Sequence, residues 1–213
     1  MLRVTEIYKS IQGESTFAGL PCAFVRLTGC PLRCAWCDTE YAFYEGVSMS
    51  IPEVLDRVER LGTCLVEITG GEPLAQKDCP ALAQALLSAG WQVLVETSGA
   101  LPIHVLPAAA IKIMDLKCPG SGECEKNDFS NLEHLTSRDE LKFVIADRAD
   151  YEWARDVVRE RELWKKVAAV HFSPVLDRLA PHKLAEWILA DGAPVRLQLQ
   201  LHKLIWQPDR RGV

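Results

Sequence analysis

Short apolar runs alternate along this chain with longer stretches in which apolar residues recur every three or four positions. The short runs, bounded by turn-forming residues, predict buried strands, and the longer periodic stretches predict amphipathic helices. The predicted strands cover 23–27, 64–69, 92–96, 111–115, 141–145, 167–172 and 195–200. The predicted helices begin at Ser50-Ile51-Pro52-Glu53 and then cover 79–89, roughly 148–162 and a segment near 180–190.

This alternation of strands and helices predicts parallel strands joined by right-handed helical crossovers. About six such units fall short of the eight that close a complete barrel. We therefore expect an α/β fold, a partial (β/α) barrel with about six mostly parallel strands, formed by a single domain over residues 1–213. Its site is expected at the carboxyl ends of the strands, as in other open parallel sheets.

Composition and charge narrow the class of partner. The chain has 213 residues, of which 48% are hydrophobic, so it is long enough to bury a core. Its net charge of −5 offers no basic footprint for nucleic acid. No apolar run has the length of a membrane span, and the first residues lack the apolar stretch of a signal peptide. We expect a cytoplasmic protein that binds neither nucleic acid nor membranes.

Three of the eight cysteines, Cys30, Cys34 and Cys37, form a Cys-x3-Cys-x2-Cys array in one short loop. Thiolates at this spacing suit three irons of a [4Fe-4S] cluster. The fourth iron is then left open, whereas an electron carrier supplies a ligand to every iron. Three zinc ligands are the alternative, but zinc sites use paired ligands and no second pair follows. Cys118 and Cys124 flank a Gly-rich loop, either as free thiols or as metal ligands.

The cysteine loop resembles that of the radical S-adenosylmethionine (SAM) enzymes, which implies a [4Fe-4S] cluster and SAM as cofactors. The segment Thr69-Gly70-Gly71-Glu72-Pro73 follows a predicted strand and resembles the SAM-binding motif of these enzymes, although a plain Gly-Gly turn is the alternative. The resemblance implies that Thr69 faces the substrate. It further implies SAM contacts from Trp36, Cys37, Asp38, Gly71, Glu72, Asp115, Leu116 and Lys117. For Asp115 and Lys117, a surface ion pair is the alternative.

A polar segment before the cysteine loop points to the substrate. Gln12, Gly13 and Glu14 offer an amide, an exposed backbone and a carboxylate, which suit the donor and acceptor edge of a pterin or guanine-like ring. A polar turn between strands is an equal alternative. Together with the motifs above, and with Gln200-Leu201-His202-Lys203 and Arg211-Gly212-Val213, this segment resembles the 7-carboxy-7-deazaguanine synthases over nearly the whole chain. Ser15 departs from the glycine often expected there.

That resemblance implies a radical SAM lyase of queuosine and 7-deazapurine biosynthesis. The reaction converts 6-carboxy-5,6,7,8-tetrahydropterin to 7-carboxy-7-deazaguanine by ring contraction with loss of ammonia. The implied substrate ligands are Gln12, Gly13, Glu14, Arg26, Thr69 and the Val213 carboxylate, and the implied Mg²⁺ ligand is Thr39. The alternatives are a surface Arg26 on an edge strand, a plain turn at Thr39 and a frayed tail at Val213. The implied partners are a flavodoxin-like or ferredoxin-like reductant and a second copy in a homodimer.

Rival functions fit parts of the sequence. A glycyl-radical-enzyme activating protein shares the cysteine loop and the Gly-Gly-Glu-Pro segment, but the Gln12-Gly13-Glu14 element favours a small-molecule substrate. A non-catalytic iron–sulfur carrier or sensor needs a fourth ligand, for which Cys22 and Cys64 are the candidates. A zinc-stabilised structural protein is the third alternative. His171 and His202 lie in or after apolar strands, and we expect both to be core histidines rather than ligands.

Overall fold

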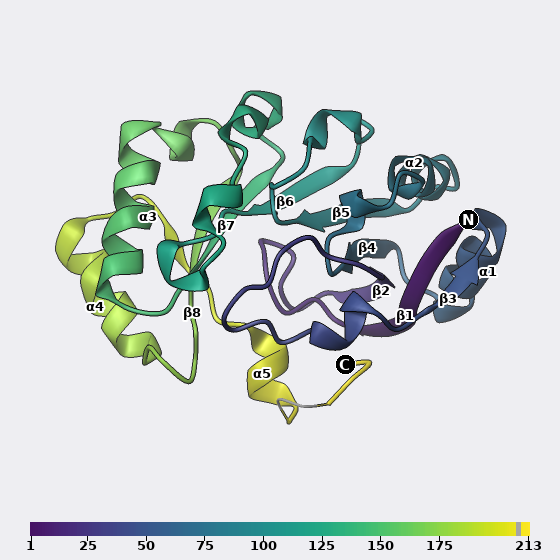
Figure 1. The fold of residues 1–213 in the computed structure, drawn as a ribbon, viewed down its shortest axis with the longest axis horizontal. Coiled ribbons are helices and arrows are strands. Elements are labelled where there is room, and N and C mark those ends of the chain that lie inside the picture. The colour runs from purple at the N-terminus through teal and green to yellow at the C-terminus, as the bar shows by residue number, and fades with distance from the viewer. Residues whose placement is uncertain (208–209) are drawn as a thin grey trace.

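A single curved sheet carries the fold of the computed structural model, which describes residues 1–207 and 210–213. Its nine strands lie in the order β3-β1-β2-β4-β5-β6-β7-β8-β9 (Figure 1). The strands are β1 Leu2–Ile11, β2 Pro21–Leu27, β3 Val47–Met49, β4 Leu65–Gly70, β5 Gln92–Thr97, β6 Ile111–Asp115, β7 Glu140–Ile145, β8 Ala169–Pro174 and β9 Arg196–Leu197. From β2 through β9 every neighbouring pair is parallel, whereas β1 runs antiparallel to both β2 and β3. The expected mostly parallel partial barrel is confirmed, with more strands than the six or so predicted.

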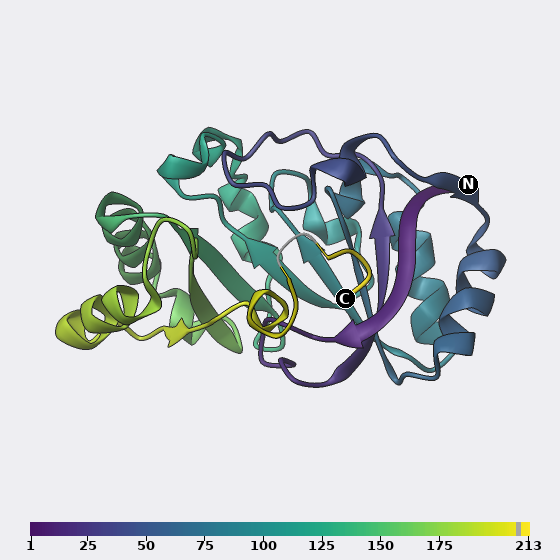
Figure 2. The same ribbon diagram turned by 90° about the horizontal axis from the view of Figure 1, so that it is seen from below.

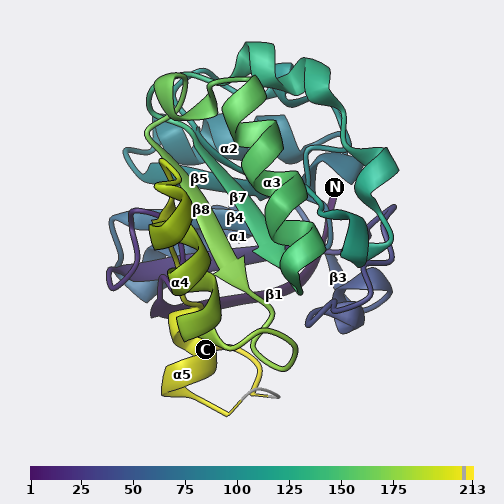
Figure 3. The ribbon, with the colours of Figure 1, turned by 90° about the vertical axis from the view of Figure 1, so that its left-hand side faces the viewer.

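The outer face of this sheet is covered by α1 Ile51–Leu61, α2 Cys79–Ser88, α3 Arg148–Glu160 and α4 Pro181–Asp191. Helix α5 Leu201–Ile205 lies apart from these four, and short 3₁₀ helices lie in the loops. Figure 3 shows α3 and α4 in front of β7 and β8. In Figure 2, α5 and the C-terminal segment lie over the open side of the curved sheet. No helix in the described part of the chain has the length and apolarity that crossing a membrane requires.

Successive residues of each strand point to opposite faces of the sheet, one toward the outer helices and the next toward the interior of the barrel. Outward residues such as Val66 and Ile68 of β4 join the core beneath α1 and α2, and Phe143 of β7 joins the core beneath α3 and α4. Inward residues form a smaller apolar cluster of Cys22, Phe24, Leu65, Leu94, Ile111 and Ile113. Buried polar residues, among them Glu67, occupy the other inward positions. Because successive side chains of a strand point to opposite faces, each strand supplies both the outer core and the interior.

Helix α1 starts where the sequence predicts. Ser50 is its N-cap, since its hydroxyl accepts from Glu53 N at 3.4 Å while Glu53 Oε2 accepts from Ser50 N at 2.7 Å. This reciprocal pair satisfies two backbone donors that the first helical turn would otherwise leave free. Gly62 ends the helix at φ 61°, a left-handed conformation that costs glycine little.

Replacing the cap tests this account of α1. We expect Ser50→Ala to lower the free energy of unfolding by about 1 kcal/mol, because an N-cap hydroxyl is lost. Urea unfolding followed by circular dichroism gives the difference. Ser48→Ala, at an exposed position of β3 just before the cap, is the matched control. Equal stability of Ser50→Ala and the wild-type protein would show that the cap contributes nothing.

Candidate active site

One cavity of about 450 Å³ opens at the carboxyl ends of the strands. Its wall contains most of the residues that the sequence predicts for a site, although they come from segments far apart in the chain. They are Gln12, Glu14, Arg26, Cys30, Cys34, Trp36, Cys37, Asp38, Thr39, Thr69, Gly71, Asp115, Lys117 and Val213. Three predicted residues, Gly13, Glu72 and Leu116, lie behind this wall. The expected position at the strand ends is therefore where these side chains meet.

The cysteine loop is held at both ends by backbone hydrogen bonds. At its start, Gly29 N donates to Ala42 O and Gly29 O accepts from Glu72 N, each at 2.8 Å. Further along, Ala35 N donates to Ser121 O at 2.9 Å. The three thiols are half-buried and face the same cavity. Burial raises the pKa of all three thiols, so a bound metal would have to stabilise their thiolate forms.

The Gly-Gly-Glu-Pro segment packs directly against the cysteine loop. A Cβ atom at Gly71 would lie 2.3 Å from Gly29 O and 2.8 Å from Cys30 Cβ, and one at Gly70 would lie 2.2 Å from Leu27 O. Only a residue without a side chain allows the end of β4 to approach the loop this closely. The glycines therefore set the height of the cysteines above the sheet.

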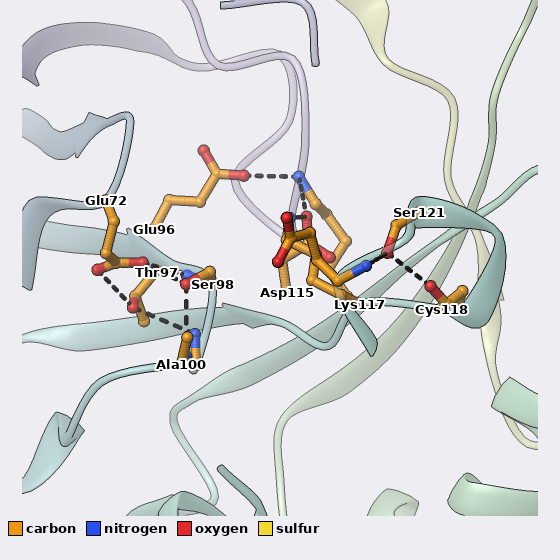
Figure 4. Close-up of polar contacts among 12 residues, drawn as sticks. Glu72, Glu96, Thr97, Ser98, Ala100, Asp115, Lys117, Cys118 and Ser121 are labelled. Carbon is orange, nitrogen blue, oxygen red and sulfur yellow. Dashed lines mark hydrogen bonds and ion pairs between the residues drawn. The ribbon is translucent and has the colours of Figure 1, made fainter. Parts of the chain in front are cut away.

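Glu72 anchors this segment from behind. Its fully buried carboxylate accepts hydrogen bonds from Thr97 Oγ1 at 2.9 Å, from Ser98 N and Oγ at 2.6 Å each, and from Leu74 N at 2.9 Å (Figure 4). These donors tie the end of β4 to the end of β5. A SAM contact from Glu72 stays a prediction, since its carboxylate faces donors of its own chain.

Asp115 and Lys117 form an ion pair in the cavity wall rather than on the surface. Lys117 Nζ lies 2.9 Å from Asp115 Oδ2, and both residues are labelled in Figure 4. The other oxygen, Asp115 Oδ1, is buried without a hydrogen-bond partner among the described residues. It is an unsatisfied buried acceptor of the site. Between the two, Leu116 points into the outer core and its N–H donates to Lys142 O at 2.9 Å.

The three residues predicted to bind a pterin ring, Gln12, Gly13 and Glu14, lie next to the C-terminal part of the chain. Gln12 is buried, with Nε2 donating to Glu67 and Oε1 accepting from Glu14 N at 3.1 Å. Gly13 O accepts from Leu201 N at 3.0 Å, and a Cβ atom at Gly13 would lie 2.5 Å from His202 Nδ1. Helix α5 thus packs against Gly13 and turns Gln12 and Glu14 toward the cavity.

Ser15 shows why a glycine is expected at its position. Its φ of 65° lies in the left-handed region that favours glycine. The side-chain amide of Gln198 compensates, accepting from Ser15 N at 2.6 Å and donating to Ser15 O at 3.0 Å. The departure from glycine therefore leaves the backbone path of the loop intact.

Arg26 is a partly buried residue of an inner strand, so the alternative of a surface arginine on an edge strand is wrong. Its Nε lies 2.7 Å from Glu6 Oε1, Nη2 donates to Tyr8 OH at 3.0 Å, and Nη1 donates to Gly70 O at 3.4 Å. A guanidinium has five N–H donors, so two are left for a ligand. Tyr8 stays protonated, because burial raises its pKa to about 12.

The C-terminal segment reaches the cysteine loop as well. Lys203 Nζ lies 2.7 Å from Asp38 Oδ2, and Thr39 Oγ1 donates to Asp38 Oδ1 at 2.8 Å. Burial favours the neutral form of Asp38, but the Lys203 ammonium outweighs it and holds the pKa of that carboxyl below its ordinary value. The Arg211 guanidinium lies 3.8 Å from the centre of the Tyr41 ring. The tail thus packs against the site, near Val213.

Several cavity residues were missed by the sequence predictions. They are Glu67 and Lys142, at inward positions of β4 and β7, and Tyr8 and Tyr41. Glu96, at the end of a predicted strand, was expected either to contact SAM or to cap the next segment, and it lines the cavity together with Gln200, His202 and Lys203 of the C-terminal motif. The prediction of a core histidine is wrong for His202, which is in the cavity wall. For His171 it is confirmed, since the ring is buried and its Nε2 lies 2.6 Å from Glu140 Oε2. Glu67 and Lys142 could have been found from the sequence, because each is a charged residue in the middle of an apolar strand.

Known proteins resemble this chain in sequence over its full length. The Radical SAM superfamily matches residues 24–117. The 7-carboxy-7-deazaguanine synthase of Koribacter versatilis is 48% identical over 226 residues that cover 100% of both chains. This chain belongs to the 7-carboxy-7-deazaguanine synthase family. The Chlorobaculum tepidum member of that family is 46% identical and covers 100% of this chain and 97% of its own.

Solved structures agree with membership of the 7-carboxy-7-deazaguanine synthase family. The crystal structure of QueE from Escherichia coli has a TM-score of 0.72 and 25% identity, and the match covers 93% of each chain. The crystal structure of archaeal TYW1 has a TM-score of 0.56 and 16% identity, covering 82% of this chain and 72% of its own. The second match shows the fold alone.

Membership of this radical SAM family implies a [4Fe-4S] cluster and SAM, and the donor set fits the cluster. Three half-buried thiols of Cys30, Cys34 and Cys37 open onto one cavity, and thiolates are the ligands that such clusters use. The remaining cysteines of the described chain lie outside the cavity wall. In the described residues, no three His, Cys, Asp or Glu side chains are grouped to hold a single metal ion, Cys118 and Cys124 included.

Adding one methyl group tests the packing of β4 against the cysteine loop. We expect Gly71→Ala to lower the free energy of unfolding by about 2 kcal/mol and to reduce bound iron after reconstitution, because the new Cβ displaces Gly29 and Cys30. Iron and sulfide analysis with thermal unfolding measures both effects. Gly62→Ala is the control for bound iron, since a Cβ there meets open space, although its φ of 61° makes alanine costly for stability as well. If both variants bound iron equally well, the close approach would not be needed for the site.

Proposed function

We propose that this chain converts 6-carboxy-5,6,7,8-tetrahydropterin to 7-carboxy-7-deazaguanine with loss of ammonia, as a step of queuosine or 7-deazapurine biosynthesis. One observation carries the proposal. A single cavity brings the three-thiol loop together with Gln12, Glu14 and Arg26, so a carboxylated ring bound to the polar residues would lie beside the cofactors. When bound, the cluster and SAM supply radical hydrogen-abstraction chemistry, and the whole chain acts as one domain.

The donor and acceptor pattern of the wall supports a pterin ring. A pterin presents N–H donors on its 2-amino group and N3. Glu14 and Glu96 supply carboxylate oxygens, and each already accepts a hydrogen bond from Lys142 Nζ at 2.6 Å. A carboxylate oxygen accepts more than one hydrogen bond, so both retain capacity for a ligand. Thr69 Oγ1 donates to Glu96 at 3.1 Å, which holds its carboxylate in place at the edge of the cavity.

Arg26 is the proposed partner of the substrate carboxylate. Glu6 and Tyr8 fix its guanidinium plane, and a planar guanidinium with two free N–H groups binds a carboxylate as a bidentate pair. Tyr41 OH donates to the same Glu6 oxygen at 2.7 Å, which further restrains the pair. The preorganised guanidinium would lose little side-chain entropy on binding.

Thr39 is the proposed protein ligand of Mg²⁺. Mg²⁺ prefers oxygen ligands and retains waters, so one hydroxyl together with substrate oxygens is a suitable set. Thr39 lines the cavity, and because its hydroxyl donates its proton to Asp38 Oδ1, its lone pairs are left for a cation. Val213 also lines the cavity, and we propose that its carboxylate contacts the substrate.

The cavity needs an electron supply and protection from water. Helix α5 and the C-terminal segment pack over its open side, where they would exclude solvent from a reactive radical. We further propose a flavodoxin-like or ferredoxin-like one-electron donor and a homodimer. Both follow from the family resemblance. Sedimentation of the reconstituted protein and turnover with each donor are the direct measurements.

An anaerobic assay tests the reaction. We expect the reconstituted protein with SAM, a reductant, Mg²⁺ and 6-carboxytetrahydropterin to form 7-carboxy-7-deazaguanine, detected by mass spectrometry. Cys34→Ala should abolish the product, because one cluster ligand is lost. Cys64→Ala should retain it, since that thiol is exposed outside the cavity wall. Formation of 5′-deoxyadenosine without the deazapurine would contradict the substrate and favour a glycyl-radical-enzyme activating protein. A four-iron protein that forms neither product would favour a carrier or sensor.

The carboxylate contact has its own test. We expect Arg26→Gln to weaken binding of 6-carboxytetrahydropterin by roughly ten- to a hundredfold, because a charge-assisted bidentate pair is lost. Binding of tetrahydropterin without the carboxyl group should change little. Calorimetry without reductant compares the two ligands. Arg155→Gln is the control, because that arginine pairs with Asp191 outside the cavity. Equal losses for both ligands would rule out the contact.

A further inference from the structure

Lys142 lies at the centre of the charged part of the cavity, although no sequence motif pointed to it. Its Nζ is 2.6 Å from Glu14 Oε2, 2.6 Å from Glu96 Oε1 and 3.7 Å from Asp115 Oδ2. The three carboxylates come from three separate elements, namely the loop after β1, β5 and β6. One ammonium therefore joins segments that are far apart in the sequence.

The exposed fraction of each side chain indicates which of these groups can contact a ligand. The Lys142 side chain is 5% exposed, whereas Glu14 is 14% and Glu96 is 28% exposed. The ammonium thus lies behind the carboxylates, and the carboxylates face the cavity. An ammonium has only donors, so it cannot accept from the N–H edge of a pterin, but it can keep carboxylates ionised for that task.

We propose that Lys142 is a positioning residue that holds Glu14 and Glu96 as a pair of ionised acceptors for the N–H donor edge of the pterin ring. This inference rests on the proposed function. Without the ammonium, Glu14 and Glu96 would share a buried cavity with Glu67 and repel one another. Glu14 would then take up a proton more readily and become a donor, which mismatches the donors of the ring.

The other charged groups near Glu14 and Glu96 do not replace Lys142 in this role. On β6, Lys117 pairs with Asp115, and next to Lys142 the Glu140 carboxylate of β7 pairs with His171 of β8. On β4, burial and the negative charges of Glu96 and Glu14 raise the pKa of Glu67 well above its ordinary value, which favours its neutral form.

From α5, His202 faces Glu14. Burial lowers the pKa of the imidazole, so His202 supplies no full positive charge at neutral pH. Burial of Glu14 favours its neutral form, yet the Lys142 ammonium outweighs burial and keeps its pKa below the ordinary value.

Replacing Lys142 by methionine removes the charge and keeps the volume. Loss of an adjacent cation raises the pKa of a carboxyl group by roughly one to three units. As pH falls, Glu14 in Lys142→Met would therefore protonate sooner. We expect binding of 6-carboxytetrahydropterin, measured without reductant, to be lost at a pH roughly one to three units higher than in the wild-type protein. At neutral pH the affinity should fall only severalfold, because most of the raised pKa range still lies below 7, and the loss should grow as pH falls.

The chain offers a matched control in Lys112. Both lysine side chains are 5% exposed, and Lys112 Nζ lies 3.1 Å from Asp139 Oδ1, but Lys112 is outside the cavity wall. Lys112→Met should lower stability and leave the pH dependence of binding unchanged. Lys142→Arg should restore part of the affinity, and methylammonium should restore binding to Lys142→Ala, because both supply a cation at the same place. Neither rescue follows from a merely structural role.

The outcomes separate this inference from the proposed function. A Lys142→Met protein with the wild-type affinity and pH dependence would overturn the inference, as would an equal pH shift in Lys112→Met. If the wild-type protein forms no deazapurine on addition of reductant, the proposed function fails. The binding curves still test the role of Lys142 in that case, because they are measured without turnover. A folded Lys142→Met protein with the shifted curve and methylammonium rescue of Lys142→Ala would establish the inference.

Discussion

Charged groups inside a sheet are tolerated only when each has a partner, and this constraint organises the interior of the partial barrel. An unpaired buried charge costs several kcal/mol, so inward charges must occur as complementary sets. Lys142 meets Glu14 and Glu96, Lys117 meets Asp115, and Arg26 meets Glu6. The pairs of Lys142 and Arg26 join different strands or loops, whereas Lys117 and Asp115 belong to one segment. The pairs that satisfy the buried charges therefore also fix the distances between ligand-binding groups.

A second constraint is the close approach between the end of β4 and the cysteine loop. The apolar outer face of β4 secures the strand against α1 and α2, and Glu72 secures its end against β5. Gly70 and Gly71 then allow backbone contact with residues 27–30. The cofactor end of the cavity thus depends on backbone packing, whereas the substrate end depends on charge pairing. The two ends tolerate different substitutions for this reason.

Most of the fold could be predicted from the periodicity of apolar residues. The elements that could not be predicted have identifiable physical causes. The register of β1 against β2 shifts between Val4 and Glu6, which breaks the alternation that marks a strand. Strand β3 and helix α5 are too short for their periods to be visible. Strand β9 was predicted over 195–200, but it pairs only at Arg196 and Leu197, because the chain then turns away to the loop after β1. Motif residues were predictable, whereas Lys142 became visible only once the strands placed its partners around it.

The C-terminal segment joins the two ends of the site. Gln198 and Gln200 hold the backbone of Ser15 and the carboxylate of Glu14, while Lys203 pairs with Asp38 of the cysteine loop. Few apolar contacts hold α5, whose Leu204 and Ile205 side chains are exposed. Its position is therefore set by polar contacts to the two loops that it joins. A shift of α5 would loosen Glu14 and Asp38 together, so the order of the loop after β1 and the order of the cysteine loop are physically coupled.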